Sequence, residues 1–159
     1  MKNLYSKNLR KDRKSIPGMY YLITKCCYNK ELLLIPNINR FEDSQQIFSI
    51  IKFAILYLEI QKVWKVISFV MMPDHFHLIV QLGEKKSLSQ AVGSLTNFVF
   101  REYHKRYDKT NKLWQKDFHD HMIKNGKSLE NIIEYVIENP LRSGYVKSTN
   151  MWPFSLLRF

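Results

Sequence analysis

The amino-acid sequence predicts an α+β fold, in which an antiparallel, ferredoxin-like split βαβ sheet is followed by an extra C-terminal helix. Strand-like and helix-like segments follow one another in the order strand, helix, strand, strand, helix, strand, helix. The first six segments spell the split βαβ pattern, with two helices on one face of the sheet. Two segments carry the clearest periodicity. Residues 75–82 alternate cleanly, as a strand does, and residues 129–137 repeat apolar side chains at helical spacing.

In the first half of the chain, residues 16–18 (Ile-Pro-Gly) punctuate the sequence before a run of β-branched and aromatic residues. This run predicts a strand over residues 19–27. Residues 41–62 contain no proline or glycine and place isoleucine and leucine at helical spacing, so we expect a helix there. Strand character returns over residues 63–72, and Pro73-Asp74 predicts the turn into the next strand.

In the second half, apolar residues at helical spacing predict a helix over residues 87–108. Residues 113–124 are expected to form the fourth strand. Asn125-Gly126 then reads as a turn and Ser128 as the N-cap of the last helix. That helix should stop at Asn139-Pro140, because a residue before proline is pushed out of helical geometry.

Length and charge limit the possible functions. The chain has 159 residues, 45% of them apolar, which suffices for one domain with a real core. Its 25 lysines and arginines outnumber 14 acidic residues, for a formal net charge of +11. Such an excess favours a polyanionic partner, nucleic acid first. We expect a flexible basic arm over residues 1–16 and a single domain over residues 17–159. The candidate DNA contacts in the arm are Arg10, Lys11, Arg13 and Lys14.

The positive charge would also suit an anionic membrane surface, but the sequence gives this alternative little other support. The longest apolar stretch, residues 47–60, is broken by polar and charged residues and is shorter than a spanning segment of about 20 residues. Residues 1–17 lack the apolar core of a signal peptide. Cys26 and Cys27 are adjacent, a spacing that suits neither an ordinary disulfide nor chelation. We therefore expect a cytoplasmic protein without a membrane partner.

The sharpest local signal is the pair His75 and His77 in the strand over residues 75–82. Alternate residues of a strand share a face, so both imidazoles point one way while Phe76 points into the core. Their Cβ atoms lie about 6.5–7 Å apart, which two imidazoles can span to one metal ion. A pair at this spacing also arises by chance. His119 and His121 form a second pair that competes for the role, but an aspartate between them gives no core anchor.

The last helix adds Tyr135 and Asn139, which are i, i+4 neighbours and project side by side. Tyr135 falls outside the apolar stripe of that helix, and Asn139 lies near its edge. A boundary tyrosine with a half-buried ring and a wet hydroxyl shows the same phase. Periodicity alone therefore leaves a nucleophile and a boundary residue as open alternatives. Tyr103 and Tyr107 are the fallback nucleophiles.

Several motifs in order resemble the REP-associated tyrosine transposases, which belong to the HUH superfamily of single-strand nucleases. The resemblance covers about residues 10–155 and extends to a first strand that begins Pro17-Gly18-Met19-Tyr20-Tyr21. The motifs are Met72-Pro73-Asp74-His75-Phe76-His77-Leu78, Leu113-Trp114-Gln115, Tyr135-Val136-Ile137-Glu138-Asn139-Pro140-Leu141-Arg142 and Trp152-Pro153-Phe154-Ser155.

The resemblance implies a function and a site. It implies that His75 and His77 are metal ligands, that Asn139 completes the site and that Tyr135 is the nucleophile. The ion would be Mg²⁺ or Mn²⁺. The activity would be cleavage and rejoining of single-stranded DNA at hairpin-associated sites through a 5′-phosphotyrosine intermediate. Beyond the arm, the candidate DNA contacts are Trp114, His121 and Arg142. Asp117 departs from the family, which usually has an arginine there, so a DNA contact made by relatives is in doubt.

Three alternatives stay open at this stage. A catalytically inactive module that binds single-stranded or hairpin nucleic acid would share the charge and the aromatic residues. A nuclease directed at RNA would share the catalytic constellation. A homodimer is possible, and in it Tyr135 could serve either its own histidines or those of the partner.

Overall fold

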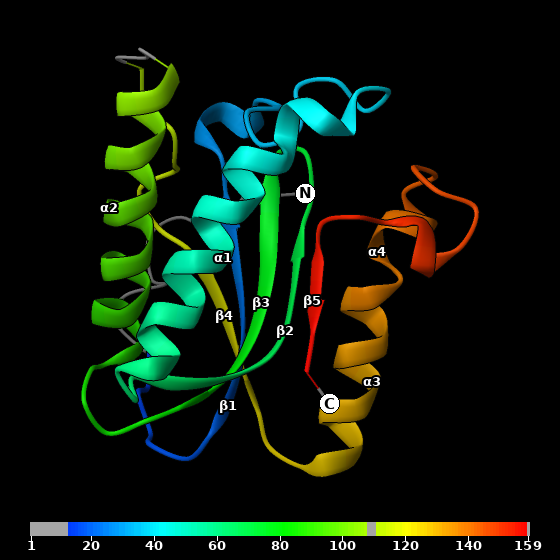
Figure 1. Ribbon diagram of the computed structural model, residues 1–159. Coiled ribbons are helices and arrows are strands. Elements are labelled where there is room, and N and C mark those ends of the chain that lie inside the picture. The colour runs from blue at the N-terminus through cyan, green and yellow to red at the C-terminus, as the bar shows by residue number, and fades with distance from the viewer. Residues whose placement is uncertain (1–12, 108–110, 159) are drawn as a thin grey trace.

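In the computed structural model, which describes residues 13–107 and 111–158, five strands form one sheet in the order β4-β1-β3-β2-β5. Every neighbouring pair is antiparallel. Helices α1 and α2 lie on one side of the sheet and α3 on the other (Figure 1). The predicted α+β class with an added C-terminal helix is confirmed. The elements are β1 (Tyr20–Cys26), α1 (Gln45–Ile60), β2 (Trp64–Met71), β3 (His75–Leu82), α2 (Leu88–Tyr107), β4 (His119–Ile123), α3 (Gly126–Ile137), α4 (Asn139–Arg142) and β5 (Ser155–Leu157), with short 3-10 turns at Tyr28–Lys30, Phe41–Ser44 and Thr149–Met151.

The register of the sheet decides which side chains face which helices. Leu78 of β3 lies opposite Phe69 of β2, and Phe69 stacks on Phe48 of α1 at 5.8 Å between ring centroids. This face therefore belongs to the core under α1 and α2. Because successive strand residues alternate faces, His77 points to the opposite face. There its register partner in β1 is Thr24.

The fourth strand is shorter than predicted: β4 covers only His119–Ile123, whereas residues 113–124 were expected to be extended. Trp114 forms an isolated bridge with Cys27 before the chain leaves the sheet. The ammonium group of the buried Lys25 then donates to the carbonyl oxygens of Gln115 and Asp117, at 2.5 and 3.2 Å from Nζ. These hydrogen bonds from a side chain take the place of the strand-to-strand hydrogen bonds that the sequence pattern suggested.

The last helix begins earlier than predicted. Its N-cap is Asn125, whose side chain accepts a hydrogen bond from the backbone N–H of Ser128 at 2.9 Å. Ser128 is thus the third helical residue and not the cap. The helix stops at Ile137, near the predicted Asn139-Pro140 boundary, and Asn139 opens a further single turn, α4, with proline in its first turn.

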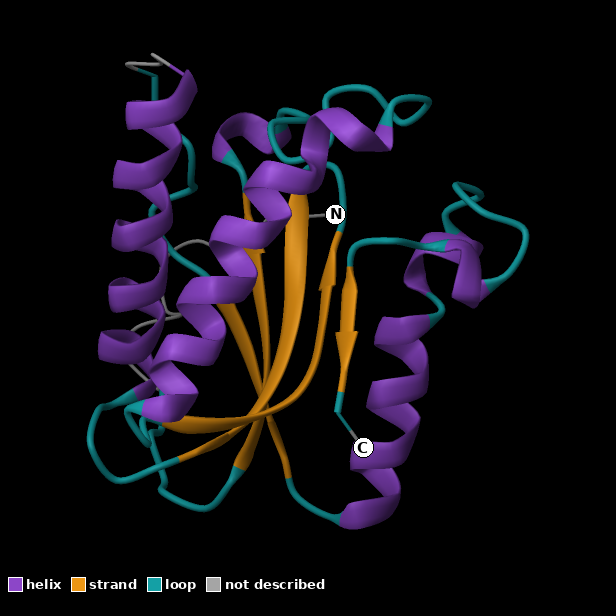
Figure 2. Ribbon diagram, viewed as in Figure 1, coloured by secondary structure: helices purple, strands orange, loops and turns teal. Residues whose placement is uncertain are grey.

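The sequence reading missed β5 entirely. This three-residue strand pairs with β2 from Ser68↔Leu157 to Val70↔Ser155. It is anchored by Trp152 and Phe154, both buried, and the Trp152 indole N–H donates to the Met71 carbonyl at 3.1 Å. Figure 2 shows β5 at the edge of the sheet, next to the helical C-terminal part. No helix within residues 13–107 and 111–158 has the length and apolar character needed to cross a bilayer.

Candidate active site

His75 and His77, at the start of strand β3, direct their imidazole rings toward one point. Their Nε2 atoms lie 3.2 Å apart, and the ring centroids are 4.8 Å apart with the rings almost perpendicular. Two nitrogens that each lie about 2.1 Å from one ion, at cis angles of roughly 90–110°, are separated by about 3.0–3.4 Å. The observed separation of the two Nε2 atoms fits a shared divalent cation.

The other nitrogen of each imidazole is held by a neighbour. Nδ1 of His75 lies 2.6 Å from a carboxylate oxygen of Asp74, and Nδ1 of His77 lies 2.9 Å from the hydroxyl oxygen of Thr24. If each Nδ1 donates its hydrogen to that oxygen, both Nε2 atoms keep their lone pairs for a metal. The sequence reading did not single out Asp74 and Thr24 for this role. Asp74 could have been found as the acid beside the first histidine, whereas Thr24 becomes a neighbour of His77 only through sheet register.

Asn139 supplies the third polar group. Its Nδ2 lies 2.8 Å from Nε2 of His77, and its Oδ1 accepts a hydrogen bond from the hydroxyl of Ser143 at 3.4 Å. A half-turn of the amide would present Oδ1 to a cation between the histidines. Within the described ranges, no cluster of three or more His, Cys, Asp or Glu side chains could hold a metal ion. A three-ligand site at this place therefore needs the amide oxygen of Asn139.

His77 is nearly buried, and its charge state follows from that. Burial above all, with smaller contributions from His75 and Arg142, lowers the pKa of its imidazole to about 3, and the nearby Asp74 partly opposes this shift. His77 is therefore neutral at ordinary pH, which is the form that binds a metal. A neutral imidazole can bind a metal ion at neutral pH without first losing a proton.

Tyr135 lies on the exposed side of α3, one turn before Asn139. Its side chain is 51% exposed, whereas the adjacent Val136 is fully buried, so the predicted position outside the apolar stripe is confirmed. The guanidinium of Arg142 covers the tyrosine ring at 4.0 Å from the centroid and also donates to the backbone carbonyl of Tyr135. Arg142 forms an ion pair with Glu138 at 3.6 Å as well. These contacts fix the ring face and leave the tyrosine side chain open to solvent.

The family follows from a comparison with known proteins. The profile of the family described as "Transposase IS200 like" matches residues 22–139, from β1 to the first residue of α4. The chain belongs to this family. The match spans all four candidate site residues, His75, His77, Tyr135 and Asn139.

Individual relatives agree with this assignment. A REP-associated tyrosine transposase of Escherichia coli K12 is 26% identical over 111 residues, covering 68% of this chain and 63% of the relative. A Haemophilus influenzae protein provisionally named a REP-associated tyrosine transposase is 29% identical over 102 residues, covering 58% of each chain. The chain therefore spans about three fifths of the length of these relatives. The resemblance predicted from the motifs is confirmed.

A solved structure shares the fold. The structure of a REP-associated tyrosine transposase bound to a REP hairpin superposes with a TM-score of 0.71 and 23% sequence identity. The superposition covers 90% of this chain and 79% of the other. At this identity the likeness concerns the fold.

The fallback nucleophiles lie away from the histidine pair. Tyr103 and Tyr107 belong to α2, which covers the opposite face of the sheet. Burial raises the pKa of both hydroxyls, with smaller increases at Tyr103 from Cys27, Tyr107 and Glu31 and a partial offset at Tyr107 from Arg106. A raised pKa makes the phenolate harder to form, and both positions are therefore poor candidates for attack.

The second histidine pair, His119 and His121, lies on β4 and does not join His75 and His77. His119 lies opposite Thr24 in the sheet and thus on the same face as His77, whereas His121 lies two residues further along β4 and is exposed. His121 is accessible to DNA, and its predicted contact remains a prediction. The described residues bring His75, His77 and Asn139 together and leave His121 outside that group.

The predicted arm needs a correction at Arg13. Its guanidinium is buried, pairs with Asp120 at 2.7 Å, donates to the carbonyl of Phe118 at 2.8 Å and covers the Phe118 ring at 3.6 Å. A side chain held in this way belongs to the folded domain and has no free face for phosphate, so Arg13 is wrongly placed in a flexible DNA-binding arm. Lys14 is exposed. Arg10 and Lys11 lie outside the described residues.

The Trp114 side chain also makes contacts inside the folded domain. Its indole N–H donates to the carbonyl of Thr96 at 3.2 Å, and the ring packs edge-on against Phe76 at 5.6 Å. The indole is only partly buried, so one part of the ring could still meet a base. Stacking by Trp114 therefore stays a prediction, as does a phosphate contact by Arg142.

Proposed function

We propose that this chain is a single-stranded DNA transposase and endonuclease that cleaves and rejoins DNA at hairpin-associated sites through a 5′-phosphotyrosine intermediate. One observation carries the proposal: Nε2 of His75, Nε2 of His77 and the amide of Asn139 meet one helical turn from the exposed Tyr135. Transesterification of a phosphodiester needs a nucleophile and a divalent cation that stabilises charge on the phosphate. A tyrosine next to three candidate metal ligands can supply both.

The residues divide the chemistry between them. His75, His77 and Asn139 would hold Mg²⁺ or Mn²⁺, which when bound supplies charge stabilisation at the scissile phosphate. The Tyr135 hydroxyl oxygen attacks the phosphorus, the bond from phosphorus to the 3′ oxygen breaks, and the phosphate stays on tyrosine. The hydroxyl proton passes to water, and the departing 3′ oxygen takes up a proton. Because one phosphodiester replaces another, attack by a 3′-OH can reverse the step and join strands.

The choice of substrate rests on charge and on a relative. The net charge of +11 favours a polyanion. The structurally similar REP-associated tyrosine transposase was solved with a REP hairpin. We therefore propose single-stranded DNA that carries a hairpin as the substrate of this chain.

The decisive experiment traps the covalent intermediate. Purified protein is incubated with a labelled hairpin-containing single strand and Mn²⁺, and adducts are resolved on a denaturing gel. Wild-type protein should form an adduct that carries the nucleotide on Tyr135, as mapped by peptide mass spectrometry. Tyr135→Phe removes one exposed oxygen, so it should fold and bind DNA but form no adduct.

Matched variants sharpen the result. Tyr145→Phe changes another exposed tyrosine and should keep the adduct at the wild-type level. An adduct on Tyr103 or Tyr107 would move the nucleophile to α2. DNA binding without any adduct would identify an inactive binding module, and an adduct formed only with an RNA strand would change the substrate class.

A further inference from the structure

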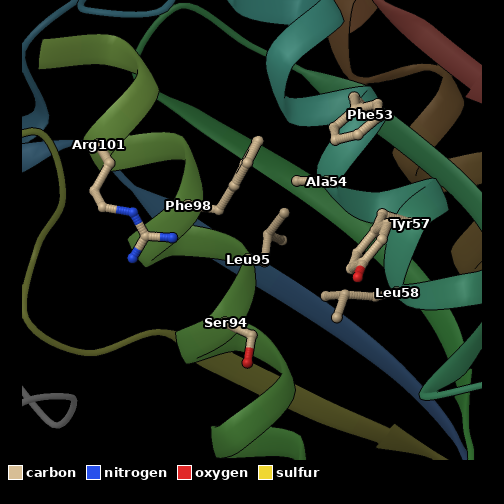
Figure 3. Close-up of a pocket in the computed structure, with 8 residues that line it drawn as sticks. All are labelled: Phe53, Ala54, Tyr57, Leu58, Ser94, Leu95, Phe98 and Arg101. Carbon is tan, nitrogen blue, oxygen red and sulfur yellow. The ribbon is translucent and has the colours of Figure 1, made fainter. Parts of the chain in front are cut away.

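An apolar groove runs between α1 and α2, on the face of the molecule opposite His75 and His77. Its main cavity has a volume of about 350 Å³ and is walled by Phe53 and Tyr57 from α1 and by Phe98 and Arg101 from α2. Figure 3 shows the aromatic side chains of the two helices turned toward the space between them, over a floor of small and aliphatic side chains. A second hollow of about 340 Å³ shares Phe53 and Phe98 and continues the groove along the helices.

Two aromatic side chains of this groove are largely exposed to solvent. Phe53 is 59% exposed and Tyr57 is 51% exposed. They stack on each other at 6.2 Å between centroids with an interplanar angle of 21°, and Phe53 also meets Phe98 at 5.8 Å. Clustered aromatic side chains that remain in water forgo the gain of burial, and such a patch marks a binding surface.

The charged groups of the groove are mostly cationic. Arg101 lines the main cavity, and Arg106 lines the second hollow. The acidic side chain there, Glu102, is paired with Arg106 at 3.2 Å. Exposed aromatic rings beside guanidinium groups form the combination that holds single-stranded nucleic acid, because bases stack on the rings while the cations meet the backbone.

A second copy of the chain fits this groove less well. Phe53 and Tyr57 together expose about 200 Å², taking roughly 200 Å² for a whole aromatic side chain, whereas a standard interface buries about 800 Å² per partner. A symmetric contact would also bring Arg101 against the same cationic surface of the copy. An area of this size matches one or two stacked bases.

We propose that the groove between α1 and α2 binds unstacked bases of single-stranded DNA at a site separate from the catalytic histidines. The proposal takes its DNA substrate from the proposed function. Because α1 and α2 cover the other face of the sheet, the bases held here belong to a segment that is not being cleaved. The groove would thus retain a flanking strand while another part of the molecule reacts.

The test measures binding in the absence of cleavage. Fluorescence anisotropy with labelled oligothymidylate of about 20 nucleotides and excess EDTA reports affinity without chemistry. Phe53→Ser combined with Tyr57→Ser should weaken binding about tenfold or more, since each stacked base contributes roughly a 5- to 150-fold factor. Ile60→Ser is the matched control: its side chain is 75% exposed on the same helix but does not line the cavity, and its affinity should stay within about twofold.

Photocrosslinking locates the contact. Oligothymidylate with 5-iododeoxyuridine substitutions should crosslink to peptides that contain Tyr57 or Phe98. Unchanged affinity in the double variant, or crosslinks confined to other surfaces, would overturn the proposal. A concentration-dependent dimer in light scattering that disappears in the double variant would identify a second copy as the occupant and would also overturn it. The adduct assay with Tyr135→Phe is independent of these readouts, so either proposal can fail while the other stands.

Discussion

At the scale of single residues, the two histidines are equivalent in sequence but not in their surroundings. His75 is partly exposed and contacts a carboxylate, whereas His77 is nearly buried and contacts the hydroxyl of Thr24. Without a partner at Nδ1, the buried imidazole could place its single hydrogen on Nε2 and lose its metal-binding lone pair. Thr24 is therefore expected to select the tautomer of His77.

Replacement of Thr24 by valine tests this role. Thr24→Val keeps the shape and β-branching of the side chain but removes the oxygen that faces Nδ1. We expect Mn²⁺ affinity to fall by about 10- to 100-fold, as is typical when the partner of a ligating histidine is lost. Calorimetry on the DNA-free protein measures it. Thr96→Val removes a buried hydroxyl on α2 that bonds only the carbonyls of its own helix, and should bind Mn²⁺ like wild type. Equal affinities of both variants would contradict the role of Thr24.

The lowered pKa of His77 predicts acid sensitivity of the metal-free protein. In the unfolded chain the imidazole has a pKa of about 6.5, and in the folded state its pKa is about 3, mainly through burial. The neutral form is favoured in the native state, so the stability is fully present above about pH 6.5 and is lost as pH falls toward about 3. Near pH 4.5 the loss should amount to about 3 kcal/mol, since the unfolded imidazole is protonated there and the folded one is not. Urea unfolding should show this loss in wild type and much less of it in His77→Gln, and parallel pH profiles would argue against it.

The site was predictable where it depended on local pattern. The histidine pair follows from strand alternation, and Tyr135 with Asn139 follows from helical spacing. That the histidine pair lies next to Asn139 could be predicted only from the family resemblance, because no local sequence pattern brings β3 next to the start of α4. Thr24 lies 53 positions from His77 in the sequence and becomes its partner through strand register. The burial of Arg13 likewise depends on residues more than a hundred positions away.

At the scale of elements, the errors occur where side chains take over backbone hydrogen bonding. Lys25 withdraws the carbonyls of Gln115 and Asp117 from the strand expected there. Asn125 moves the start of α3 ahead of Ser128. Strand β5 is too short for any periodicity to show, and it is fixed by the buried rings of Trp152 and Phe154.

The N-cap of α3 is open to a direct test. Asn125→Ala removes the oxygen that accepts from the backbone N–H of Ser128, and should lower the free energy of unfolding by about 1 kcal/mol. Ser128→Ala should cost much less, because Ser128 contributes its backbone N–H to the cap. Chemical denaturation of both variants measures the difference. A larger loss for Ser128→Ala would restore Ser128 as the cap.

At the scale of the whole molecule, the sheet separates two surfaces with different tasks. One face holds His75, His77 and Asn139 under the end of α3, and the other carries α1 and α2 with their aromatic groove. A strand of DNA that reaches both must pass around an edge of the sheet. The excess of positive charge, +11 over the chain, is what would hold such a strand along its path.

Affinity for single-stranded DNA should therefore depend steeply on salt. If about six phosphates of a single strand are contacted, affinity should fall roughly 300-fold between about 50 and 200 mM salt. Replacing Arg10 and Lys11 by glutamine should flatten the slope of log K against log salt by about 1.4 units, since each of the two lost contacts to a single strand removes roughly 0.7. Arg40→Gln is the matched control. Arg40 is already paired with Glu42 and Asp43, so this variant should leave the slope unchanged.

Arg13→Gln should also leave the slope unchanged while it lowers stability, because the Arg13 guanidinium is already bonded to groups inside the fold. A flattened slope for Arg13→Gln with full stability would return Arg13 to the DNA-binding surface, and an unchanged slope for the variant at Arg10 and Lys11 would remove those two residues from it.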